Sequence, residues 1–181
     1  MIEEKCVGCG ACQLVCPHKA IQVKGYEFDK VLASYGEAAK RMRSFSDRPA
    51  ILVFSCQWSE FSALDDPERM LKGKNAMVME VPCFKGMDPV HVINALKSGF
   101  DGVMAVVCSE TDCKLQKGRD VADRQLEVLR NALKKLGLSD RFELHELSPR
   151  CEGEFAAKFD AFDRKVIEMS KGSFVPGGSQ P

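Results

Sequence analysis

The hydrophobic and polar positions of the chain predict a regular alternation of strands and helices over most of its length. Four short segments are expected to be strands: 50–55, 76–81, 102–107 and 142–147. Longer segments repeat apolar residues at three- and four-residue steps and are expected to be helices: 28–46, 88–98, 120–136 and from about 152 onward. A further short strand is expected at 20–24, where apolar and polar residues alternate.

The order of these elements predicts the fold class. Strands that alternate with helices imply a parallel sheet covered by helices on its faces. The run 50–55 is apolar almost throughout, as expected for a strand buried on both sides. We therefore expect an α/β fold with a small parallel four-stranded sheet flanked by helices, of flavodoxin or Rossmann-like type. The segment 56–75 predicts only a short irregular helix.

Cysteines near the start of the chain form the strongest local motif. Cys6, Cys9, Cys12 and Cys16 follow the spacing C-x2-C-x2-C-x3-C-P, which holds a 4Fe–4S cluster in bacterial ferredoxins. Because the chain has one such run, all four thiolates are expected to hold one cluster. A structural zinc site also uses C-x2-C pairs, but it generally joins two pairs across a longer gap. The motif predicts a small ferredoxin-like 4Fe–4S module ahead of the α/β fold.

Four parts of the chain are expected from these patterns. They are a 4Fe–4S module at 1–27, a helical connector at 28–48, an α/β domain at 49–170 and a loose Gly-, Pro- and Ser-rich tail at 171–181.

Composition limits the cellular setting and the class of partner. The 26 basic and 26 acidic residues cancel, so nothing indicates a nucleic-acid surface. The sequence opens without a signal peptide and holds no apolar run that could span a bilayer, so we expect a cytoplasmic protein with no direct membrane insertion. In that compartment thiols stay reduced, and nine cysteines indicate metal binding or catalysis.

A second group of cysteines follows the predicted strands. Cys56, Cys83 and Cys108 come at the ends of the first, second and third strands of the α/β domain, and Cys113 lies in the next loop. The carboxyl ends of parallel strands meet at one edge of a sheet, where binding sites form. These thiols are expected to bind a 2Fe–2S cluster, a 4Fe–4S cluster or zinc, although a buried cysteine also serves as a small hydrophobic residue.

Two neighbouring residues are weaker candidates for the second site. Cys151 precedes the last helix, where a helix N-terminus favours a thiolate, and could replace one of the four ligands. Ser59 is a poor ligand beside thiolates and is expected to hydrogen-bond to the cluster instead.

His91 and His145 are expected to have packing or surface roles, within a helix and a strand. The sequence contains no dinucleotide fingerprint, phosphate loop or Ser–His–acid arrangement.

Residues 50 to about 168 resemble the delta subunit of methyl-viologen-reducing hydrogenase, which accompanies heterodisulfide reductase. The resemblance rests on several short motifs in the same order and spacing: Phe54-Ser55-Cys56-Gln57-Trp58, Cys83 before Asp88-Pro89, Gly99-Phe100-Asp101-Gly102-Val103, Asp112 within Cys108-x4-Cys113, and Glu152-Gly153-Glu154-Phe155. Two positions depart from the family. Ser59 stands where a second cysteine is common, and Cys151 where a small residue is common.

The resemblance implies a non-catalytic electron-transfer subunit with a 2Fe–2S cluster. Such a subunit works in a hetero-oligomer, where it connects a partner hydrogenase, dehydrogenase or reductase with a heterodisulfide-reductase-A-like flavoprotein subunit. The N-terminal module would add a 4Fe–4S cluster to the electron path.

Two other functions fit the cysteines. One is a thiol/disulfide oxidoreductase that cycles Cys108 and Cys113, although C-x4-C is not the usual redox spacing. The other is an assembly subunit whose second site binds structural zinc.

Overall fold

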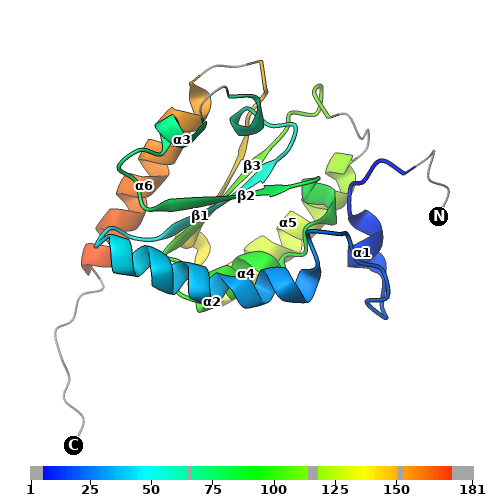
Figure 1. The fold of residues 1–181 in the computed structure, drawn as a ribbon, viewed down its shortest axis with the longest axis horizontal. Helices are drawn as coiled ribbons and strands as arrows, with labels where there is room; N and C mark the ends of the chain where they lie inside the picture. The colour runs from blue at the N-terminus through cyan, green and yellow to red at the C-terminus, as the bar shows by residue number, and fades with distance from the viewer. Residues whose placement is uncertain (1–5, 65–66, 114–117, 151–152, 173–181) are drawn as a thin grey trace, which may run out of the picture.

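The computed structural model describes residues 6–64, 67–113, 118–150 and 153–172. It contains the expected four-stranded α/β fold with a small cysteine-bearing loop at the N-terminal end (Figure 1). The strands are β1 (Ile51–Cys56), β2 (Ala76–Val81), β3 (Gly102–Val107) and β4 (Phe142–Glu146). The α-helices are α1 (Ala11–Val15), α2 (Phe28–Phe45), α3 (Pro67–Met70), α4 (Val90–Lys97), α5 (Gly118–Lys135) and α6 (Glu154–Gly172). The short 3-10 helices include η2 (Phe61–Ala63), η3 (Phe84–Gly86) and η4 (Ser139–Arg141).

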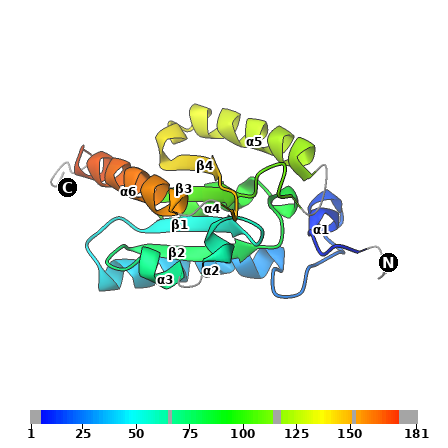
Figure 2. The ribbon, with the colours of Figure 1, turned by 90° about the horizontal axis from the view of Figure 1, so that it is seen from above.

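All neighbouring strands are parallel, in the order β2-β1-β3-β4 (Figure 2). In the register of the sheet, Cys56 at the end of β1 pairs with Val81 at the end of β2. Ser55, one residue earlier in β1, pairs with Val106 near the end of β3. The carboxyl ends of these three strands therefore lie at one edge, which confirms the expected fold class and topology.

Helices cover both faces of the sheet. Leu52 and Phe54 of β1 pack on one side with the apolar faces of α2, α4 and α5, and Ile51 and Val53 pack on the other side with α6. Figure 1 shows α2, α4 and α5 below the sheet and α6 above it. The inner face of α6 lies in this second core, with Phe155, Phe159, Phe162 and Val166 buried and Met169 packed against them.

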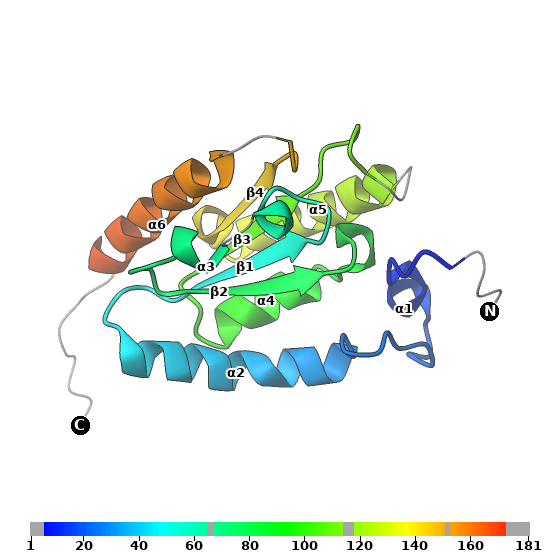
Figure 3. The ribbon, with the colours of Figure 1, turned by 45° about the horizontal axis from the view of Figure 1, so that its top comes forward.

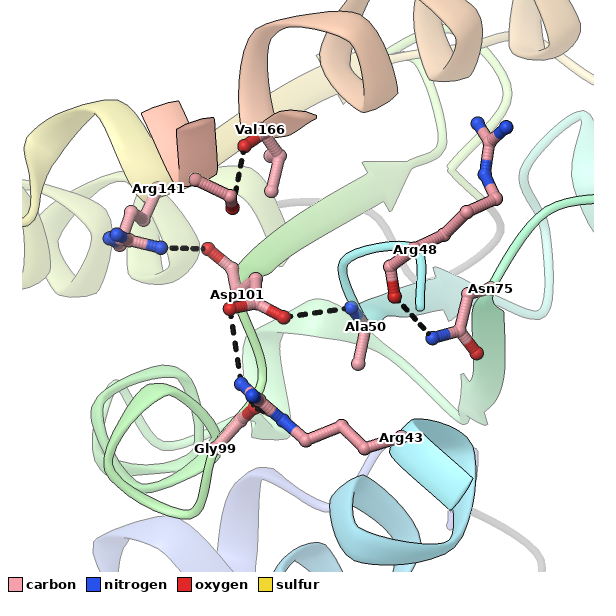
Figure 4. Close-up of polar contacts among 9 residues, drawn as sticks. Arg43, Arg48, Ala50, Asn75, Gly99, Asp101, Arg141 and Val166 are labelled. Atoms are coloured by element: carbon pink, nitrogen blue, oxygen red, sulfur yellow. Dashed lines mark hydrogen bonds and ion pairs between the residues drawn. The ribbon is translucent and has the colours of Figure 1, made fainter. Parts of the chain in front are cut away.

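Polar contacts close the opposite edge of the sheet, where β1 and β3 begin (Figure 4). Asp101 accepts a hydrogen bond from the Ala50 N–H at 2.9 Å and forms an ion pair with Arg43 at 3.1 Å. Its own carbonyl accepts a hydrogen bond from Arg141 at 2.8 Å. These contacts join the end of α2 to the starts of β1 and β3, at the edge remote from the strand-end cysteines.

Most predicted boundaries agree with the structure to within one to three residues. The Asp88 carboxylate accepts the Val90 N–H at 2.8 Å, as expected of a helix cap, although the regular turns of α4 begin at Val90. The predicted strand at 20–24 is wrong. The Val23 N–H donates instead to the side chain of Gln13 at 2.6 Å. Alternation alone does not make a strand when no neighbouring strand is there to pair with it.

Among the described residues, no helix is long and apolar enough to cross a membrane.

Candidate metal centres

The N-terminal cysteines lie on a tight loop around α1. Gly8 and Gly10 adopt positive φ angles of 68° and 77°, which residues with a side chain rarely adopt, and Gly10 directly precedes the helix. None of the residues of α1 is buried, and the four thiols range from half-buried to exposed. A loop of this kind can offer its thiols and its backbone N–H groups to a cluster without first opening a core.

Backbone N–H groups already converge on one of these sulfurs. A backbone hydrogen bond from Ala20 has the largest effect and lowers the pKa of Cys16. Desolvation opposes it, and smaller contributions from the backbone N–H groups of His18, Ile21 and Lys19 lower the pKa further. Hydrogen bonds to sulfur stabilise thiolates and tune clusters that thiolates hold. The surroundings of Cys16 therefore fit an iron–sulfur ligand.

The second site lies at the carboxyl edge of the sheet. Cys56 is the last residue of β1, Cys83 directly precedes η3 after β2, and Cys108 follows β3. The sulfur atoms of Cys56 and Cys108 lie 3.9 Å apart. Two thiolates on one tetrahedral metal with metal–sulfur bonds of about 2.3 Å are about 3.8 Å apart. This pair therefore fits two ligands of a single metal ion.

The electrostatics of this pair favour one thiolate. A hydrogen bond with Cys108 lowers the pKa of Cys56, and N–H groups of Trp58 and Phe84 lower it further, against desolvation. The pKa of Cys108 is raised correspondingly, by its bond to Cys56, by burial and by Cys113. These opposite shifts favour a thiolate on Cys56 and a thiol on Cys108, and a metal ion held by both sulfurs would displace the remaining proton.

A salt bridge and hydrogen bonds fix the loop that carries Cys108 and Cys113. Asp112 forms an ion pair with Arg150, which lies beyond β4, and accepts a hydrogen bond from the Ser109 hydroxyl. The Asp112 N–H also donates to the Ser109 carbonyl at 3.1 Å. The loop is therefore tied both to itself and to the segment after β4.

The structure brings only part of the second predicted ligand set together. Within the described ranges, no three Cys, His, Asp or Glu side chains gather closely enough to hold one metal ion. Cys113 is half-buried near Cys108, and Cys151 lies outside the described residues. The Ser59 hydroxyl hydrogen-bonds to Ser55 at 3.0 Å, and both residues are fully buried. The other thiols at the edge must approach Cys56 and Cys108 to complete a four-thiolate site.

Comparison with known families found matches over both cysteine-bearing parts of the chain. The family model for the delta subunit of methyl-viologen-reducing hydrogenase matches residues 51–170, and the model for the 4Fe–4S binding domain matches residues 1–22. The chain belongs to the methyl-viologen-reducing hydrogenase delta subunit family. The second match identifies its N-terminal loop as a 4Fe–4S binding domain.

Individual relatives of this delta-subunit chain fall into two groups. It is 31% identical, over 92% of its length, to a subunit of the ferredoxin/F420H2-dependent CoB-CoM heterodisulfide reductase of Methanosarcina acetivorans. It is 28% identical, over 70% of its length, to an iron-sulfur subunit of the F420-non-reducing hydrogenase of Archaeoglobus profundus. The delta-subunit chain covers 94% of the Archaeoglobus relative but only 25% of the Methanosarcina relative. It therefore spans about a quarter of the longer reductase subunit.

Two residues that organise the sites were not predicted from the sequence. Gln13, within the cysteine run, bonds to the Val23 N–H and donates to the Tyr26 carbonyl at 3.0 Å, so it anchors the return of the loop. Gly86 lies against the backbone of the cysteine loop. Gln13 could have been noticed as a polar residue inside the N-terminal cysteine run. Nothing in the sequence distinguishes Gly86, three residues after Cys83, from an ordinary turn glycine.

Proposed function

We propose that this delta-subunit chain is an electron-transfer subunit with two iron–sulfur clusters. Cys6, Cys9, Cys12 and Cys16 bind a 4Fe–4S cluster, and Cys56, Cys83, Cys108 and Cys113 bind a second cluster of 2Fe–2S type. The observation that carries the proposal is the 3.9 Å separation of Cys56 and Cys108 at a sheet edge beside the 4Fe–4S loop. The clusters supply one-electron redox chemistry, and the protein positions them and tunes their potentials.

The relatives suggest the partners. One is named as part of a heterodisulfide reductase, and another as an iron-sulfur subunit of a hydrogenase. We infer that the chain connects a hydrogenase, dehydrogenase or reductase with a heterodisulfide-reductase-A-like flavoprotein subunit, in a hetero-oligomer. The stretch similar to this chain is part of a single longer polypeptide in the Methanosarcina relative, which supports close association with the reductase.

The test measures iron and acid-labile sulfide per chain on anaerobically purified protein, with EPR spectra of the reduced sample. C83A and C108A should each lose the iron and the EPR signal of the second cluster and keep those of the 4Fe–4S cluster. S59A is the matched control, because Ser59 is buried nearby but its hydroxyl bonds to Ser55. It should keep both clusters. Full iron content in both cysteine variants would contradict the second site.

A thiol/disulfide function is the second candidate, because the thiols of Cys108 and Cys113 lie close enough to hydrogen-bond to each other. The same measurement separates the two functions. A relay contains iron and sulfide beyond the 4Fe–4S cluster. A thiol/disulfide exchange enzyme contains only the 4Fe–4S cluster and forms a Cys108–Cys113 disulfide on oxidation. Zinc in place of the additional iron would indicate a structural metal site.

A further inference from the structure

The cysteine loop and the turn η3 touch through backbone atoms at Gly86. A Cβ atom placed on Gly86 would lie 2.4 Å from the carbonyl oxygen of Cys9 and 2.7 Å from the carbonyl carbon of Gly10. Both distances are far shorter than van der Waals contact. Any side chain at this position would therefore force the two segments apart. Figure 3 shows α1 beside the carboxyl ends of the strands, close to the turn that follows β2.

Space, not backbone conformation, requires glycine at position 86. Gly8 and Gly10 have positive φ angles, whereas Gly86 does not. Alanine could adopt the backbone conformation of Gly86 without strain. The obstacle to a methyl group there is the cysteine loop itself.

The cysteine loop is the side that would move. Phe84 and Met87 flank the turn, are 8% and 3% exposed, and belong to the core cluster that includes Leu126 and Leu129 of α5. No residue of α1 is buried. A methyl group on Gly86 meets backbone atoms, which cannot rotate away as a side chain can, so it would displace the loop from the body.

The contact joins the two proposed clusters by a short route. On one side lies the carbonyl of Cys9, a ligand of the 4Fe–4S cluster. On the other, the Gly86 N–H donates to the carbonyl of Cys83 at 3.0 Å, and Cys83 is a proposed ligand of the second cluster. One non-bonded contact and one hydrogen bond thus connect the main chains of two ligands.

We propose that Gly86 is a positioning residue that sets the separation of the two clusters, and that electrons pass between them by way of Cys9, Gly86 and Cys83. This inference rests on the proposed function. Each transfer moves one electron, oxidises one cluster and reduces the other, and neither forms nor breaks a bond. No proton has to move with it through this contact.

The experiment compares the unmodified protein with G86A and G36A. Gly36 is the matched control, because it lies in α2 without a positive φ and its added Cβ would meet nothing within 4 Å. Iron and sulfide content should be equal in all three proteins. With both clusters reduced, the EPR spectra of the unmodified protein and G36A should show spin–spin interaction between the clusters, and G86A should lose it. Hydrogen exchange over residues 9–22 should be faster in G86A alone.

Each outcome decides one of the two claims. Undiminished spin–spin interaction in G86A, or unchanged exchange over residues 9–22, would overturn the positioning role. If the unmodified protein shows one cluster only, the proposed relay fails and the electron route fails with it. Faster exchange in G86A would then still show that Gly86 seats the cysteine loop on the body.

Discussion

At the scale of single residues, Asp101 shows how one carboxylate can satisfy several groups at the start of a sheet. One of its oxygens accepts the N–H of Ala50, which is fully buried, and the other pairs with Arg43, which is largely exposed (Figure 4). The two interactions contribute differently to the free energy of unfolding. A buried N–H without an acceptor costs about 1–3 kcal/mol, whereas an exposed ion pair contributes about 0–1 kcal/mol.

We therefore expect D101A and D101N to differ in stability. D101A removes the acceptor of the Ala50 N–H and should lower the free energy of unfolding by about 1–3 kcal/mol. D101N keeps an acceptor oxygen and loses only the charge, so its loss should stay below about 1 kcal/mol. Urea denaturation of both variants measures the difference. Equal losses would mean that the ion pair with Arg43, and not the hydrogen bond to Ala50, stabilises this edge.

At the scale of elements, a buried polar pair holds α2 against α4. The Tyr35 hydroxyl lies 2.8 Å from His91 Nδ1, and both side chains are fully buried. Aromatic rings surround the imidazole, with the rings of Phe28 and Tyr26 at 4.9 Å and 5.8 Å between centroids. Burial lowers the pKa of His91 to about 4, and the nearby Asp88 only partly offsets this effect.

This pKa predicts that acid weakens the fold. Between pH 6.5 and about 4, the unfolded chain protonates His91 and the folded chain does not, so stability falls as the pH falls. The loss from this residue between pH 7 and pH 5 should be about 2 kcal/mol. Urea denaturation of wild type and H91N at both pH values measures it. The comparison cancels any acid loss of clusters, and equal pH slopes in the two proteins would contradict the assignment to His91.

The elements themselves could be predicted largely from the sequence, because β1 and β3 are apolar runs that are buried on both faces and the helices repeat apolar residues at helical spacing. β2 and β3 have the bounds expected from their apolar runs, and β1 differs by one residue at each end. The convergence of Cys56 and Cys108 was also accessible, since parallel strands bring their carboxyl ends together. The bounds of the strands and the position of their ends can be predicted from local patterns, because these features depend on which residues of each element are buried.

Other features depend on contacts between distant segments, and the sequence did not reveal them. The false strand at 20–24 shows this, because its backbone bonds to Gln13 and not to a neighbouring strand. The contact between Gly86 and the backbone of the cysteine loop is a second example, because nothing in the sequence near Gly86 indicates that it packs against residues about 76 positions earlier. The hydrogen bond between the hydroxyls of Ser59 and Ser55 is a further contact that the position of Ser59 alone did not indicate.

At the scale of the whole molecule, the core and the cysteine loop are separate in their packing. The buried hydrophobic residues run from Tyr26 to Val166, and none belongs to α1. The loop returns to the body through Gln13 and meets it at Gly86. The body should therefore fold without the first cluster, whereas the loop needs metal to hold its shape, as small metal-binding modules generally do.

A double substitution of ligands, Cys9→Ser with Cys12→Ser, tests this division of the molecule. It should remove about four irons per chain and leave the signal of the second cluster. The free energy of unfolding of the α/β body should change by no more than about 0.5 kcal/mol, because neither Cys9 nor Cys12 belongs to the buried core. Iron analysis, EPR and urea denaturation followed by far-UV circular dichroism measure these quantities. Hydrogen exchange should rise over residues 6–22 and stay unchanged in β1 and β3. Destabilisation of the body by several kcal/mol would show instead that the 4Fe–4S cluster is part of its folding core.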